Sequence, residues 1–257
     1  MHFSPPLLIW FELSILISVL AMKLSSLKTA GSLRDAREFF FLSPVFSTIS
    51  WKKRRASDRL ALRSILIRGA FLFPLFATSW GLYLKWVPLL KPGVVTQSYL
   101  ALVPVYLLGQ LLSTVLELLY LPTGWHFPAH FQFPPLSRSV ADFWGNRWGT
   151  WVADWLRQMV FLRCRRKPVL GLFFAFLLSG IWHELLLDVP FFLFFGVNLL
   201  GWWTLYFMIQ ALGIWGERKF FRSPGLLHWI YTWSMIVLPA PLAINEGALR
   251  TFGLFIG

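Results

Sequence analysis

His183 is the residue whose type and position point most directly to chemistry. It lies late in a long apolar stretch, within the segment Ser179-Gly180-Ile181-Trp182-His183-Glu184. An ionisable side chain is costly in a hydrocarbon environment, so each such residue is a functional hypothesis. An imidazole surrounded by apolar groups stays neutral and can take up a proton, as a general base must. A histidine that only forms a hydrogen bond to a neighbouring helix is the alternative interpretation.

The sequence neighbours of His183 have distinct expected roles. Ser179 lies one helical turn earlier on the same face, and Gly180 leaves room for a neighbouring helix or a substrate. Glu184 projects about 100° further around the helix, so we expect it to orient a different neighbour rather than His183 itself. Glu12 and Glu117 also lie in apolar segments, and we expect structural roles for both, with a partner such as an arginine.

Other kinds of catalytic site have little support. The sequence contains no phosphate-binding glycine loop and no Gly-x-Ser-x-Gly motif. The His183-Glu184 pair lacks the second histidine of a His-Glu-x-x-His zinc site. Cys164 is the only cysteine, which excludes a disulfide within the chain. We therefore expect neither a metal ion nor a resident cofactor.

The elements that carry these residues must be membrane helices. Of the 257 residues, 57% are hydrophobic and 18% aromatic, and the mean hydropathy is +0.62, which lies well outside the range of soluble domains. A spanning helix needs about 20 mostly apolar residues. Windows that meet or approach this length are 5–22, 69–90, 98–120, 169–187, 189–213 and 226–243. We predict an all-α, polytopic membrane helix bundle of about six spans, forming a single domain over residues 1–257.

Basic residues, which give the chain a net charge of +13, cluster between these windows. Clusters flanked by apolar segments indicate membrane topology and anionic headgroups rather than nucleic acid binding. By the positive-inside rule, we place the loops 23–68, 121–168 and 214–225 in the cytoplasm.

The loop 121–168 is more than a linker. Prolines interrupt its first part, and from Val140 to Phe161 aromatic residues recur at roughly three- and four-residue spacing, with charged residues largely between them. This pattern predicts an amphipathic helix that lies in the membrane interface. The loop 23–68 is likewise interpreted as partly interfacial helix.

Two motifs connect this loop with the span that follows. The first is Asp142-Phe143-Trp144-Gly145-Asn146-Arg147-Trp148, and the second, some 35 residues further on, is Ser179-Gly180-Ile181-Trp182-His183-Glu184. In this order and context they resemble the wax-synthase-like branch of the membrane-bound O-acyltransferase family. The resemblance covers roughly residues 120–220.

The resemblance implies a helix bundle around a tunnel, which acyl-CoA enters from the cytoplasmic side and a hydroxyl-bearing acceptor from the bilayer or the opposite side. A long-chain alcohol, giving a wax ester, is one candidate acceptor. His183 would then be the general base. Substrate-binding roles are implied for Asp142, Trp144, Arg147, Trp148, Ser179 and Glu184. The CoA phosphates would meet Arg147, Arg163, Arg165 or Arg166.

One position departs from the family pattern. The residue after the last tryptophan of the first motif is usually Asn or His, and here it is Gly149. Asn146, three residues earlier, is therefore our candidate for the second catalytic position, as a donor to the reacting oxygen. Its alternative role is to cap the loop.

Two functions from other classes remain open. In a transporter, His183, Glu117 and Glu12 would form a proton or solute path, and two related halves with broken helices would be expected. In a membrane scaffold that holds a partner through the loop 23–68, His183 would serve packing only and would tolerate replacement.

Overall fold

The computed structural model describes residues 5–29, 32–43, 45–47, 58–123, 129–221, 223 and 225–256. Within these ranges all regular structure is helical, which confirms the predicted all-α class. The helices are α1 (Pro5–Ser26), α2 (Leu33–Leu42), α3 (Asp58–Leu90), α4 (Val94–Tyr120), α5 (Val140–Asp142), α6 (Thr150–Met159), α7 (Pro168–His183), α8 (Val189–Phe195), α9 (Trp202–Phe220), α10 (Leu226–Val237), α11 (Ala240–Ala243) and α12 (Glu246–Thr251).

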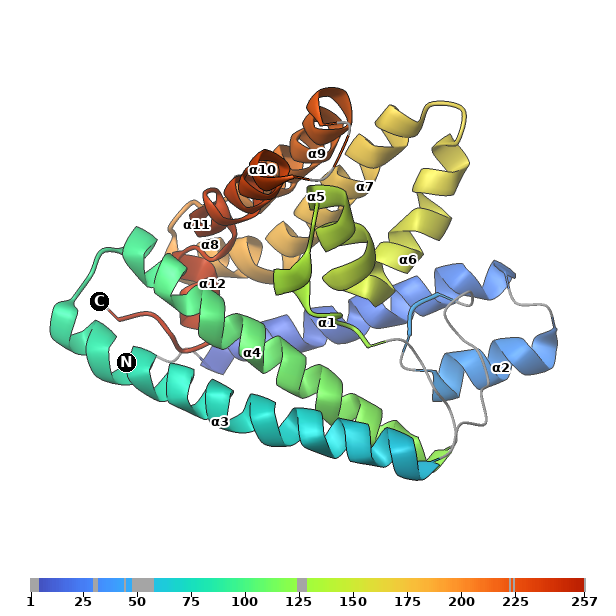
Figure 1. Cartoon of the computed structure of the whole chain (residues 1–257), viewed down its shortest axis with the longest axis horizontal. Coiled ribbons are helices and arrows are strands. Elements are labelled where there is room, and N and C mark those ends of the chain that lie inside the picture. Colours follow the sequence, from blue (N-terminus) through green and yellow to red (C-terminus); the bar gives the residue numbers. More distant parts are fainter. Residues whose placement is uncertain are drawn as a thin grey trace.

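The long helices form two groups (Figure 1). α3 and α4 pack side by side along one edge of the molecule, and α7, α9 and α10 pack together on the opposite side. α1 contacts α6, α8 and α12, so it belongs with the second group. The indole N–H groups of Trp155 and Trp182 donate to Ser25 Oγ and Ser18 Oγ of α1, at 2.9 and 2.7 Å.

The C-terminal segment joins the two groups. The Tyr83 hydroxyl donates to the carbonyl oxygen of Leu254 at 2.9 Å, and the Gln97 side chain bonds both backbone groups of Ile256, at 2.6 and 3.0 Å. Leu254 is fully buried in a core that α3, α4 and α12 share. Buried amide and hydroxyl groups therefore fasten this segment where lipid offers no hydrogen-bond partner.

Five helical segments of the described residues are long and apolar enough to cross a membrane. They are 5–26, 62–90, 94–120, 168–195 and 226–243. The predicted polytopic membrane protein is thus confirmed. α1 runs on to Ser26 and α3 already begins at Asp58, so part of the loop 23–68 belongs to the long helices. The basic run 52–55 of that loop lies outside the described residues.

The predicted division between the windows 169–187 and 189–213 is wrong. α7 continues through a π-helical turn, Glu184–Asp188, into α8. Asp188 is fully buried and accepts hydrogen bonds from Asn245, so this carboxylate needs no aqueous loop. The chain breaks instead between Gly196 and Gly201, whose φ angles of 69° and 96° only glycine adopts readily. α9, which follows, is not among the five candidate spans of the described residues.

The single amphipathic helix predicted from Val140 to Phe161 is also wrong. The chain forms α5, a π-helical turn over Phe143–Arg147, and then α6. Trp148 is extended and Gly149 is left-handed, with a φ of 60°, which separates the turn from α6. The hydrophobic periodicity reflects the burial of each piece rather than one continuous helix.

Candidate active site

His183 is the last residue of α7, and one hydrogen bond fixes the position of its proton. Its Nδ1 lies 2.7 Å from the carbonyl oxygen of Ser179. A carbonyl can only accept, so Nδ1 carries the hydrogen and Nε2 has a lone pair. Ser179 lies on the same face as predicted, but it contacts His183 through its backbone rather than through its hydroxyl.

Aromatic rings of α9 pack against the imidazole. The Trp203 ring stacks on His183 with a centroid distance of 4.7 Å and an angle of 25°, and Phe207 follows at 4.8 Å. Trp182 contacts the imidazole edge-on, at 5.1 Å. This environment is apolar, which favours a neutral imidazole.

Glu184 bonds a residue of α9 rather than His183. This carboxylate is buried, and its Oε1 accepts the backbone N–H of Thr204 at 2.9 Å in the first turn of α9. Gly180 makes the approach possible, because a Cβ at this position would lie 2.7 Å from Thr204 Cα. The predicted room for a neighbouring helix is thereby confirmed. The outcome is a close contact that places Trp203 and Phe207 against His183.

Asp188 and Asn245 form a second polar contact one turn beyond Glu184. Asn245 Nδ2 donates to both carboxylate oxygens of Asp188, at 2.9 and 3.1 Å, and both residues are fully buried. Asn245 Oδ1 also accepts the N–H of Ala248 and so caps α12. The π-helical turn after His183 is therefore held from two sides, a placement common at functional sites.

The first motif forms a compact loop centred on Asp142. Its carboxylate accepts Arg147 Nε at 2.7 Å, Asn146 Nδ2 at 3.2 Å and the backbone N–H of Arg138 at 3.2 Å. Partial burial opposes ionisation, but the hydrogen bonds from Arg147, Asn146 and Arg138 and the guanidinium charge hold the pKa of Asp142 below its usual range. Asp142, Asn146 and Arg147 thus stabilise the loop.

Trp144 connects the loop of the first motif with the residues that surround His183. Its indole N–H donates to Gln210 Oε1 of α9 at 3.1 Å, and its ring lies 5.3 Å from Phe207, which also contacts His183. Trp148 points elsewhere, stacking on Phe143 at 5.5 Å and on Tyr106 of α4 at 6.4 Å. Of the predicted loop residues, Trp144 is therefore the one that these contacts link to His183.

α9 supplies three residues that the sequence reasoning missed. Besides Trp203, they are Gln210, which also donates to the carbonyl of Met235 at 2.7 Å, and Glu217. The buried Glu217 carboxylate accepts the N–H groups of Val140 and Ala141, at 2.7 and 3.0 Å, and so caps α5. Their spacing of seven residues places all three on one helical face, a signal present in the sequence.

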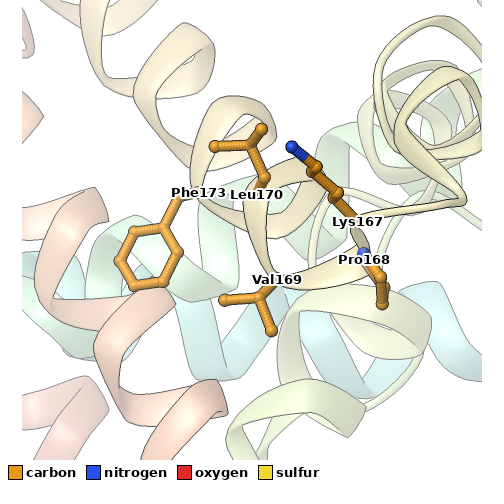
Figure 2. Close-up of a pocket in the computed structure, with 5 residues that line it drawn as sticks. All are labelled: Lys167, Pro168, Val169, Leu170 and Phe173. Carbon is orange, nitrogen blue, oxygen red and sulfur yellow. The ribbon is translucent and has the colours of Figure 1, made fainter.

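An open hollow of about 510 Å³ lies at the other end of α7 (Figure 2). It is lined by Lys167, Pro168, Val169, Leu170 and Phe173. Fifteen helical steps of about 1.5 Å separate Pro168 from His183, so the hollow is not the histidine site. In the part of the chain that the structure describes, no His, Cys, Asp and Glu side chains form a group that could hold a metal ion.

The fold and this site define a helical integral membrane protein with a neutral histidine in an aromatic enclosure. Residues 127–191, which carry both motifs, match the family model described as the membrane bound O-acyl transferase family. The predicted resemblance to this family, and to its wax-synthase-like branch, is confirmed.

Individual relatives agree with this resemblance. The chain is 31% identical over 136 residues to a probable long-chain-alcohol O-fatty-acyltransferase 7 of Arabidopsis thaliana, covering 49% of this chain and 39% of the relative. A probable long-chain-alcohol O-fatty-acyltransferase 9 of the same plant is 29% identical over 57% of this chain and 45% of the relative. A teichoic acid D-alanyltransferase of Bacillus subtilis is 34% identical over 23% of this chain and 18% of the relative. The chain thus spans less than half the length of these relatives.

Proposed function

We propose that this protein is a membrane O-acyltransferase that moves an acyl group from acyl-CoA to a hydroxyl acceptor, with His183 as the general base. The observation that carries the proposal is the hydrogen bond from His183 Nδ1 to Ser179, which leaves Nε2 as a proton acceptor inside an aromatic wall. The named activities of the relatives support the reaction class and favour a long-chain alcohol as the acceptor.

In the proposed reaction, the acceptor oxygen attacks the thioester carbonyl carbon while His183 Nε2 takes the hydroxyl proton. The C–S bond then breaks, and the leaving thiolate receives that proton from the imidazolium. An ester and free CoA result without an acyl-enzyme. A site closed to water would also keep the thioester from hydrolysis and hold the two substrates together.

The basic residues best placed to bind the phosphates of acyl-CoA lie at the N-terminal end of α7. Arg165 and Arg166 are exposed beside the hollow that Lys167 borders, and by the predicted topology this end faces the cytoplasm. Arg147, in contrast, already bonds Asp142 and two carbonyl groups. We therefore assign phosphate contacts to Arg165 and Arg166 before Arg147.

The test is ester formation by membranes that contain the protein. Radiolabelled acetyl-CoA and a long-chain acyl-CoA are each offered with a long-chain alcohol, a terpenoid alcohol and a polar hydroxyl compound. Wild-type membranes should form an ester, His183→Ala should abolish it, and added imidazole should restore part of the activity. His130→Ala, which removes another imidazole packed between aromatic rings, is the matched control and should retain activity per folded protein. Equal activity of wild type and His183→Ala would contradict the assigned base, and a folded wild type inactive with every pair would contradict the reaction.

A further inference from the structure

The proposed reaction develops negative charge on the thioester oxygen, which calls for a hydrogen-bond donor beside His183. Asn146 Nδ2 already donates to Asp142 Oδ1 at 3.2 Å. Gly149, at the position where the family usually has a polar side chain, has none. We therefore look for this donor among the side chains that contact His183 directly.

The indole N–H of Trp203 has the required position. Its ring stacks directly on the His183 imidazole at 4.7 Å. Its Nε1 is buried and has no hydrogen-bond partner within the described residues. The two other indoles close to this centre are occupied, since Trp144 donates to Gln210 and Trp182 to Ser18.

The chemistry of an indole N–H suits an oxygen that gains negative charge. The group donates and cannot accept, so it does not compete with His183 for the proton. Buried N–H groups are nearly always paired, and those that are not require an explanation, such as a ligand atom.

Trp203 is also held firmly before substrate binds. Phe207 stacks beside its ring at 6.1 Å and Tyr206 contacts it edge-on at 6.3 Å. The neighbouring Thr204 N–H is bonded to Glu184. A donor fixed in advance costs no reorganisation in the transition state, which is the condition for electrostatic catalysis.

We infer that Trp203 is a further catalytic residue, whose indole N–H binds the thioester carbonyl oxygen. This inference rests on the proposed function. As the acceptor oxygen bonds to the carbonyl carbon, the C=O electron pair moves onto the carbonyl oxygen. The hydrogen bond from the Trp203 N–H to the carbonyl oxygen strengthens at the same time. When the C–S bond breaks, the pair returns to the carbonyl and the thiolate takes the proton from His183.

The test removes the N–H without removing the ring, because Trp203 also packs against the core cluster of Leu186, Leu187 and Ala248. Trp203 is replaced by 3-benzothienylalanine, in which sulfur takes the place of the indole N–H, and by Phe as a genetically simple variant. Trp233 receives the same replacements as the matched control, since its Nε1 is also buried without a partner in the described chain but its ring contacts lie with Phe143 and Trp229.

We expect the benzothienyl variant at Trp203 to lose about 100-fold or more in kcat, with little change in KM and in thermal unfolding. The same variant at Trp233 should keep wild-type kcat. Unchanged kcat at Trp203, in a protein that His183→Ala inactivates, would overturn the role of Trp203 and leave the proposed function intact. An active His183→Ala protein would instead overturn the proposed function itself.

Discussion

The guanidinium of Arg147 is held at three points in the first motif. Besides its bond to Asp142, its Nη1 donates to the carbonyls of Gln132 at 3.2 Å and Phe133 at 3.4 Å. A lysine ammonium cannot reproduce this fork. We expect Arg147→Lys to lower the unfolding free energy by on the order of 1–3 kcal/mol, measured by thermal unfolding in detergent. Arg166→Lys, at an exposed position, is the control and should unfold like wild type.

His130 makes the stability of the loop region depend on pH. Burial between Phe131 and Trp151 lowers the pKa of this imidazole from 6.5 to about 4. The unfolded chain therefore binds a proton at a pH at which the folded protein does not. The contribution of His130 to the unfolding free energy is fully present above about pH 6.5 and is lost as the pH drops toward 4.

The shift corresponds to at most about 3 kcal/mol. The measurement is thermal unfolding in detergent between pH 7 and 4, for wild type and His130→Phe. The phenylalanine variant should lose less stability on acidification. Parallel pH profiles for the two proteins would mean that His130 titrates alike in the folded and unfolded states.

The close approach of helices α7 and α9 holds the aromatic rings of α9 against His183. A methyl group at Gly180 would press on the backbone of Thr204, which cannot yield as a flexible side chain would. We expect Gly180→Ala to cost about 1–3 kcal/mol of stability and to lower acyl transfer per folded protein, because Trp203 moves away from His183.

Gly81 in α3 is the matched control for this substitution. It also lies inside a helix, but a Cβ there meets nothing within 4 Å. Gly81→Ala should therefore raise helix stability by up to about 1 kcal/mol and leave activity unchanged. Equal effects of the two substitutions would show that the α7–α9 contact is not critical. Thermal unfolding measures the stability of both variants, and the ester assay measures their activity.

Glu217 connects α9 to the first motif through two backbone N–H groups of α5. A glutamine is uncharged and has one acceptor oxygen, so one of these bonds is lost and the other weakened. We expect Glu217→Gln to loosen the loop around Trp144 and to lower kcat more than it raises KM. Glu246→Gln, which removes a carboxylate paired within α12 with Arg250, should leave kinetics unchanged. A larger loss of kcat in Glu246→Gln than in Glu217→Gln would contradict the role of Glu217.

The sequence predicted elements well where the length of an apolar stretch or a glycine sets the local structure. It predicted them less well where a partner far away in the sequence sets the structure. His183, Ser179 and Gly180 could be placed on one helix face because helical spacing is local. The contact between Trp144 and Gln210 joins residues 66 positions apart, and no local pattern specifies such a partner. The two predicted windows separate at Asp188, but its partner Asn245, 57 positions away, makes the burial of this carboxylate within a helix possible.

For the whole molecule, α9 aligns the two motifs even though it lies outside the residues that match the family model. Its N-terminal turn meets Glu184 and His183, its middle meets Trp144, and its C-terminal end meets α5. Polar contacts between helices carry this alignment, which fits a bundle in lipid, where apolar contact alone does not favour one helix partner over another. The site is therefore a property of the bundle rather than of the matched segment.

The orientation of this bundle in the membrane is a prediction of the positive-inside rule, and it can be tested with the native cysteine. The segment 168–195 is about 42 Å long as a helix, enough to cross a hydrocarbon core of about 30 Å. Cys164, the only cysteine, precedes it within the basic loop, and the exposed Val197 follows it. These two positions should lie on opposite sides of the membrane, with Cys164 in the cytoplasm.

A membrane-impermeant maleimide distinguishes the sides in intact cells. We expect Val197→Cys, in a Cys164→Ser background, to react in intact cells, and Cys164 in the wild type to react only after permeabilisation. Reaction of Cys164 alone in intact cells would mean that the basic loops face outward, and the proposed donor site at Arg165 and Arg166 would then lack access to cytoplasmic acyl-CoA. Reaction of both positions from one side would mean that 168–195 does not cross, which would place His183 near a surface rather than inside the bilayer.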